Sequence, residues 1–289
     1  MAVFLCVLHT PLHAASVASS GAQAHAGTSG TTSAEENVAH EIAITLVQPG
    51  REGLELAAQL MEGGGLIERP VKWRVSDPEG GVMFDSETPT ADISLAPGDY
   101  QVDIHYGAAH LARTLTLLPG NRLAVRFVLN VGGIRVLPQV KGIGLPEAQS
   151  HTRIYALAGL RQGQLVAESQ MPGEILRVPA GEYRIESSFD LGNTIAVTDV
   201  KVSPGKLSAV QVGHIAGLAR LAFVGAPDAN VSWDVLNGSG EPMAHLNGLN
   251  ATVVLKPGTY RASASTGSET LTATFAITEG EARDIILGN

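Results

Sequence analysis

The chain is poor in cysteine, in charge and in long hydrophobic runs, and each shortage excludes a class of protein. A single cysteine in 289 residues excludes a disulfide framework and a cysteine-based zinc cluster. After the first few residues, no uninterrupted apolar run reaches about 18 residues, so the sequence predicts no transmembrane helix. Nineteen Lys and Arg against 28 Asp and Glu give a net charge of −9, which argues against a nucleic-acid partner.

Glycine and proline are abundant instead. The chain has 33 Gly and 15 Pro, while only 16% of its residues are charged. This composition favours many short strands joined by turns over long exposed helices. The length corresponds to roughly two domains at about 150 residues each, which is enough for a sizeable core without a metal or disulfide.

The first residues have features of a secretory signal. Residues 2–8 form a short apolar run, and small residues follow at 14–18 as a cleavage site would require. No Lys or Arg precedes the run, so either the segment is not a signal or the true start lies upstream. Leu5 stands directly before Cys6, where a lipidation site needs a small residue, so Cys6 is interpreted as an unmodified thiol.

We therefore expect a signal peptide over residues 1–18 and a flexible linker rich in Ser, Gly and Ala over 19–40. Such a protein would be periplasmic, secreted or displayed at the cell surface.

Two landmarks recur three times along the rest of the chain. A turn rich in Pro and Gly ends in a tyrosine, and an aromatic residue precedes that tyrosine by 27, 28 and 27 residues. Three copies in register indicate an internal repeat. The landmark pairs are Trp73 with Tyr100, Tyr155 with Tyr183, and Trp233 with Tyr260.

Within each copy the apolar residues alternate with polar ones, which predicts strands with one buried face. In the third copy the expected strands start near 218, 230, 242, 250, 259, 268 and 281. Residues 55–61 have helical propensity, but they align with strands of the other copies, so a strand is predicted there.

The fold class expected from these patterns is all-β, with three tandem seven-stranded β-sandwiches of the Ig-like or prealbumin-like kind. The repeats would cover residues 41–130, 131–215 and 216–289, and residues 41–48 would add a loose extra strand because they resemble a final strand of a copy. The very short links between copies predict a semi-rigid rod.

The aromatic landmarks have two interpretations, a ladder of sugar-stacking platforms or core residues of each sandwich. Their register with the apolar face favours the core. We expect Trp73, Tyr155 and Trp233 to be buried at equivalent positions near the three landmark tyrosines. The turn before each tyrosine also resembles a tyrosine corner, in which the phenol bonds to the backbone.

The L-x-P-G-x-Y element after a V-x-W-x-V strand resembles bacterial prealbumin-like modules, which include the carboxypeptidase-regulatory-like, PEGA and collagen-binding B-type domains. The resemblance covers residues 53–289 and implies a non-catalytic stalk or interaction role at the bacterial envelope. It transfers no functional residue, because no lysine–asparagine isopeptide arrangement is evident.

No nucleotide-binding, zinc-protease or serine-hydrolase motif occurs. We predict no catalytic residue, no cofactor and no metal site, and His105 and His110 are expected on a solvated strand face. An enzyme would need a clustered acid/base pair, and none can be named.

Function is expected in the loops that differ between copies. Two of these loops carry exposed-looking apolar residues that are either partner contacts or caps of a sandwich: Leu66, Ile67, Ile143 and Leu145.

The sequence thus favours a non-catalytic exported envelope protein, a spacer or interaction module whose partner is another envelope protein or a surface polymer. The alternative is a module that binds polysaccharide or peptidoglycan.

Overall fold

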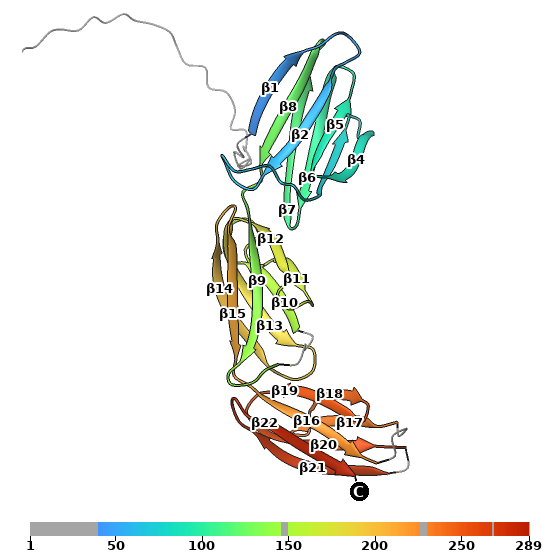
Figure 1. Cartoon of the computed structure of the whole chain (residues 1–289), viewed down its shortest axis with the longest axis vertical. Coiled ribbons are helices and arrows are strands. Elements are labelled where there is room, and N and C mark those ends of the chain that lie inside the picture. The colour runs from blue at the N-terminus through green and yellow to red at the C-terminus, as the bar shows by residue number, and fades with distance from the viewer. Residues whose placement is uncertain (1–39, 146–149, 226–229, 268, 289) are drawn as a thin grey trace, which may run out of the picture. The chain divides into compact units, whose positions relative to one another are not determined.

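The computed structural model describes residues 40–145, 150–225, 230–267 and 269–288. The expected signal peptide, with Cys6, lies outside these residues, as does the expected linker except for its last residue. All regular elements of the described ranges are β-strands, as the alternating pattern predicts, and the strands form sandwiches in tandem (Figure 1). These ranges contain no helix that is long and apolar enough to cross a membrane.

The first sandwich has eight strands in two four-stranded sheets, ordered β1-β8-β2-β5 and β4-β3-β6-β7. The extra strand expected near 41–48 is β1, and the helix-prone segment forms β2, whose Leu54, Leu56 and Ala58 are buried. The strands are β1 (His40–Leu46), β2 (Gly53–Gln59), β3 (Val71–Ser76), β4 (Val82–Thr88), β5 (Thr90–Ser94), β6 (Gly98–Tyr106), β7 (Ala109–Leu117) and β8 (Asn121–Val128).

The second sandwich has seven strands, in sheets ordered β12-β9-β15 and β11-β10-β13-β14. Its first and last strands pair in parallel, as β2 and β8 do in the first sandwich. The strands are β9 (Val131–Val140), β10 (Ser150–Ala156), β11 (Leu165–Ser169), β12 (Ile175–Pro179), β13 (Gly181–Phe189), β14 (Ile195–Val202) and β15 (Leu207–His214).

The third sandwich repeats this plan with sheets β19-β16-β22 and β18-β17-β20-β21. The seven strand starts expected from turn spacing each lie within two residues of an observed start. The strands are β16 (Gly217–Val224), β17 (Ser232–Asn237), β18 (Pro242–Asn247), β19 (Asn250–Leu255), β20 (Gly258–Ser265), β21 (Thr270–Ile277) and β22 (Ala282–Gly288).

The tyrosine landmark is a tyrosine corner in all three sandwiches. Each phenol donates a hydrogen bond to the backbone carbonyl four residues earlier, and each ring is buried. This bond fixes the turn against the strand that follows it. The donor and acceptor pairs are Tyr100 with Ala96 at 2.8 Å, Tyr183 with Pro179 at 2.7 Å, and Tyr260 with Lys256 at 2.9 Å.

The tryptophan landmark is equally regular in the first and third sandwiches. Trp73 and Trp233 are fully buried, and each indole Nε1 donates to a backbone carbonyl 2.9 Å away, at Thr88 and Gly248. Each ring therefore fills the core while its one polar atom is satisfied.

The expectation for Tyr155 is wrong. Its side chain is half-buried, while its neighbours Ile154 and Ala156 face the core. Trp73 and Trp233 each lie opposite the residue four positions after the corner tyrosine, on the neighbouring strand. In the second sandwich, the residue at this place in the ladder is Thr152. Thr152 precedes its tyrosine by 31 residues rather than 27, and a shift of three along a strand moves a side chain to the opposite face.

Candidate functional site

The four loop residues expected to contact a partner have different environments. Leu66 is exposed, while Ile67 is buried in the core of the first sandwich. Ile143 and Leu145 are half-buried and pack against a cluster that includes Val140. That cluster joins Val140 and Phe189 of the second sandwich to Leu218 and Val254 of the third.

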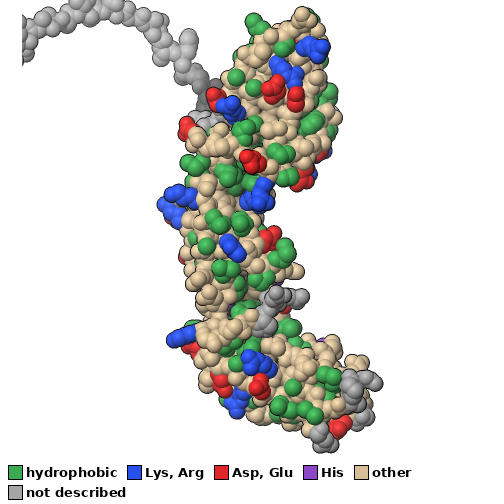
Figure 2. All heavy atoms as spheres, in the orientation of Figure 1, with side chains coloured by type: hydrophobic (Ala, Val, Ile, Leu, Met, Phe, Trp, Pro, Cys, Tyr) green, Lys and Arg blue, Asp and Glu red, His purple; other side chains and the backbone are tan. Residues whose placement is uncertain are grey.

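A surface depression of about 640 Å³ lies at the loop of the second sandwich. Ile143 and Leu145 line it together with Lys141 and the edge of His214. Its wall carries one cation, one imidazole and the carboxylate of Glu279 beside apolar side chains. On the face shown in Figure 2, basic and acidic side chains are interspersed rather than gathered into one charged patch.

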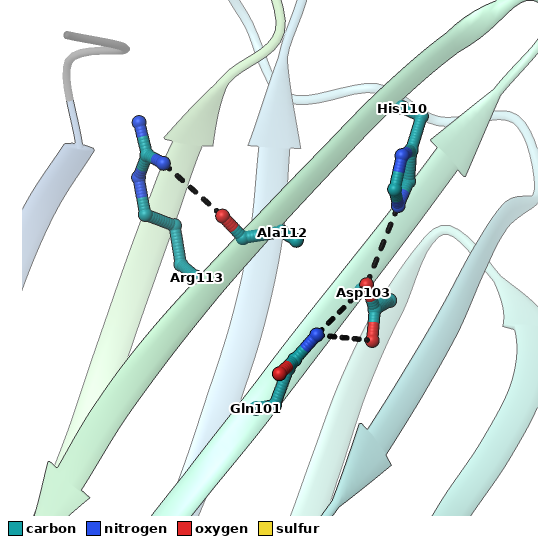
Figure 3. A network of polar contacts seen from close by, with 5 residues as sticks. All are labelled: Gln101, Asp103, His110, Ala112 and Arg113. Carbon is teal, nitrogen blue, oxygen red and sulfur yellow. Dashed lines mark hydrogen bonds and ion pairs between the residues drawn. The ribbon is translucent and has the colours of Figure 1, made fainter. Parts of the chain in front are cut away.

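The outer face of the β6–β7 hairpin carries a polar network (Figure 3). The Asp103 carboxylate accepts hydrogen bonds from Gln101 Nε2 at 3.4 Å and lies 3.3 Å from His110 Nε2. The His105 ring stacks on His110 with 4.3 Å between ring centroids. Desolvation by burial, and next the nearby His110, lower the pKa of His105. The expectation that His105 lies on a solvated strand face is confirmed, because its side chain is exposed.

This network lies on a flat sheet face and has no third metal ligand. The described part of the chain contains no group of three or more His, Cys, Asp or Glu side chains that could bind a metal ion. On the same hairpin, Arg113 donates a hydrogen bond to the Ala112 carbonyl at 3.1 Å (Figure 3).

One position on the outer sheet face carries a cross-strand pair of an acidic and a basic residue in every sandwich. The first partner lies next to the Trp73 position on β3, β10 or β17, and the second lies opposite it on the neighbouring strand. In the third pair the sign is reversed, with the acid on the first strand. The pairs are Arg74–Asp85 at 3.6 Å, Arg153–Glu168 at 4.0 Å and Asp234–His245 at 2.8 Å.

The second sandwich contains a buried polar cluster that the other two lack. Ser150, Thr152 and Ser187 are at most 5% exposed, and the positions that match them in the first sandwich hold Val71, Trp73 and Ile104. The same positions in the third sandwich hold Val231, Trp233 and Ala264.

His214 contacts one member of this cluster, Ser187, and also Thr194, whereas the Ser150 hydroxyl has no hydrogen-bond partner among the described residues. The ring is 3% exposed, its Nε2 lies 3.0 Å from Ser187 Oγ, and its Nδ1 lies 3.2 Å from Thr194 Oγ1. Phe189 packs on the ring with 4.7 Å between centroids. Burial lowers the pKa of His214 to about 4, so the ring is neutral at pH 7.

The contact between Ser187 and His214 pairs a hydroxyl with an imidazole, as a nucleophile and its base would be paired, but it lacks the surroundings of an active site. Ser187 is fully buried, and among the described ion pairs none orients His214 through a carboxylate. A nucleophilic serine needs access to substrate and a base positioned by a third group. The cluster is therefore part of the core, where the imidazole satisfies two hydroxyl groups.

Sequence reasoning missed this cluster because it aligned Tyr155 with the tryptophans. The sequence signal was present in three hydroxyl residues at inward-facing strand positions where the other copies are apolar: Ser150 and Thr152 on one strand and Ser187 on another. His214 occupies the position of the buried Leu129, two residues after Val212, and follows the same alternation.

Comparison with known proteins gave one family match. The Rhizobiales growth-associated tandem repeat domain matches residues 224–287, which lie in the third sandwich. Comparison with curated protein sequences found no match.

Solved structures are similar only at low scores. The TIE protein of Bacillus anthracis aligns over 82% of this chain and 50% of its own, with 15% identity and a TM-score of 0.25. The minor pilin of Streptococcus agalactiae aligns over 55% and 95%, with 15% identity and a TM-score of 0.26. The major pilin subunit of Bacillus cereus aligns over 82% and 99%, with 8% identity and a TM-score of 0.24. The present chain thus corresponds to half the length of the first of these proteins.

Proposed function

We propose that the chain is a non-catalytic protein of the bacterial envelope that acts as a spacer and presents surfaces for protein interaction. The observation that carries this proposal is the series of sandwiches, each with its own core, joined by very short connections. β8 ends at Val128 and β9 begins at Val131, while β15 ends at His214 and β16 begins at Gly217. With two intervening residues, the strand ends are three Cα–Cα steps apart and lie at most about 10 Å from each other, so neighbouring sandwiches have little freedom to separate.

The aromatic side chains favour this proposal over a polysaccharide-binding module. Stacking on sugar rings needs exposed aromatic faces. Of the two Trp and five Tyr residues, six are buried, and the remaining one, Tyr155, is half-buried.

Small-angle X-ray scattering on the exported protein tests the spacer role. A compact globule of about 250 residues has a radius of gyration of about 18 Å. A spacer gives a clearly larger value that does not change with salt, whereas a value near 18 Å would remove the physical basis of the proposal. Fractionation with amino-terminal sequencing tests export, and an intact Met1 on envelope-bound protein would contradict a cleaved signal.

A further inference from the structure

The three sandwiches differ at one edge of the sheet that contains their first and last core strands. Each builds that sheet on a parallel pair of its first and last core strands, namely β2–β8, β9–β15 and β16–β22. In the first sandwich the outer edge of β8 is paired with β1 in the antiparallel sense. In the other two, β15 and β22 end their sheets, so the corresponding edges have no strand partner within the described residues.

β1 contributes little to the core of its own sandwich. Its apolar side chains are largely exposed, with Ile42 at 41%, Ile44 at 63% and Leu46 at 84%. Backbone pairing from His40–Phe127 to Leu46–Asn121 holds the strand, with one exposed ion pair of 3.2 Å between Glu41 and Arg126. An exposed pair of this kind adds at most about 1 kcal/mol.

The second and third sandwiches show that the fold does not need a β1. Their corresponding sheets have three strands, yet Ile134 and Leu221 at their centres are fully buried. Release of β1 would therefore leave the first sandwich in the strand arrangement of its neighbours. The backbone bonds that β1 gives up can form again on another open edge.

The outer edge of β22 is an open edge on which the backbone hydrogen bonds of β1 could form again. Its Ile285 occupies the position of Val125, which lies opposite Ile42 in the β1–β8 ladder. Beside it, Ile286 is 65% exposed, where β8 has Arg126 and β15 has Gln211. An exposed apolar residue on an open edge strand attracts another strand unless charge or proline prevents it.

We propose that β1 of one copy of this chain pairs with β22 of a second copy, so that the chain assembles head to tail by adding an edge strand. The donor strand and acceptor edge belong to different sandwiches, so each added copy leaves a new donor and a new acceptor free. Such a heterologous contact extends into a filament instead of closing as a dimer. The inference rests on the proposed protein-interaction role and names its partner as a second copy.

A cysteine trap tests the pairing in the full chain with Cys6→Ser. In the register of β1 on β8, Glu41 lies opposite Arg126, whose counterpart on β22 is Ile286. A Glu41→Cys chain is mixed with an Ile286→Cys chain and oxidised, and the 41–286 disulfide is quantified by mass spectrometry. Matched controls replace the acceptor by Gln211→Cys on β15, or by Arg261→Cys on β20, which is paired on both sides.

We expect about tenfold more 41–286 product than 41–261 product, a ratio that corresponds to about 1.4 kcal/mol. Equal yields for the two would overturn the proposal, and a dominant 41–211 product would overturn the choice of β22 as acceptor.

A second measurement is independent of cysteine reactivity between chains. The double variant Glu41→Cys/Arg126→Cys locks β1 onto its own β8 when oxidised. In sedimentation velocity the parent chain should form larger species as its concentration rises, and the locked chain should remain monomeric until a reductant is added. A parent chain that stays monomeric, or a locked chain that still assembles, would overturn strand addition, while the scattering result on the spacer role would stand.

Discussion

The middle sandwich and its two neighbours share one backbone plan but fill their cores with different chemistry. In the first and third, a tryptophan with one satisfied N–H lies on an inner strand of the sheet that also contains the corner tyrosine. In the middle one, Thr152 takes that position, and hydroxyl groups gather around a buried imidazole. The strand ladder and the tyrosine corner therefore specify the fold, and core residues between them can change from apolar to polar without changing it, even where a hydroxyl such as that of Ser150 has no hydrogen-bond partner in the part of the chain that the structure describes.

The largest expected effect comes from removal of a tryptophan. Trp233→Ala should lower the free energy of unfolding of the third sandwich by about 3–5 kcal/mol, because a large buried ring is lost and a cavity remains. Thr152→Ala at the matched position should cost only about 1 kcal/mol in the middle sandwich. Hydrogen exchange read by mass spectrometry follows each sandwich separately. Similar losses at the two positions would show that the middle core depends on Thr152 as much as its neighbours depend on tryptophan.

The next effect is a pH dependence confined to the middle sandwich. The pKa of His214 is lowered by burial from 6.5 to about 4 in the folded state, so the unfolded chain binds the proton more tightly. The free energy of unfolding should therefore fall as the pH drops from about 6.5 to about 4, by up to about 3 kcal/mol, and level off below that. The groups that face the ring are the hydroxyls of Ser187 and Thr194 and the ring of Phe189.

His214→Gln provides the control, since glutamine can bond the same hydroxyls but does not titrate. The free energy of opening of middle-sandwich peptides, obtained from hydrogen exchange after correction for the intrinsic exchange rate at each pH, should differ between pH 7 and pH 5 in the parent chain and not in this variant. An unchanged pH dependence in His214→Gln would place its origin in another group.

A smaller effect should be common to all three sandwiches. Tyr183→Phe removes the hydrogen bond to the Pro179 carbonyl and should lower the free energy of unfolding by about 1 kcal/mol. Tyr100→Phe should cost about the same, measured by urea unfolding with peptide-resolved exchange. Tyr260→Phe should cost more, because the Tyr260 hydroxyl also accepts a hydrogen bond from Asn193 Nδ2 at 3.1 Å. Equal losses at Tyr100 and Tyr260 would show that the contact with Asn193 adds nothing to stability.

The smallest effect concerns the cross-strand pairs on the outer face. A double-mutant cycle on Arg74 and Asp85 should give a coupling of at most about 1 kcal/mol that decreases with salt, because both side chains are exposed. A coupling that salt leaves unchanged would indicate a packing contact rather than a charge interaction.

The sequence predicts the strands and the tyrosine corners well because both depend on short-range patterns. Alternation fixes which residues of β20 face inward, and the turn before Tyr260 fixes where that strand begins. Even the helix-prone residues of β2 are predicted correctly, since comparison between copies outweighs their local propensity.

The register of β10 is not predicted, and the polar cluster is missed with it. An aromatic residue does not mark the buried face of a strand when it lies on the other face, as Tyr155 does. Thr152 precedes its corner tyrosine by four residues more than Trp73 and Trp233 precede theirs, so spacing does not reveal that these three residues are equivalent. Pairing of Ser187 with His214 joins residues 27 apart through the fold, so no local pattern contains it. The open edges of β15 and β22 likewise depend on sheet order, which alternation alone does not specify.

The direction of β1 determines how the chain would respond to a pulling force. β1 runs antiparallel to β8, so the chain enters at His40 beside Phe127, next to Val128 where β8 ends. Tension between the amino-terminal segment and the rest of the chain would therefore peel β1 away one pair at a time. β9 and β15 run parallel, so the chain enters and leaves that pair at opposite ends, and the same tension would load all of its hydrogen bonds together in shear. We expect β1 to yield at low force and to lengthen the chain while the cores of the sandwiches remain intact.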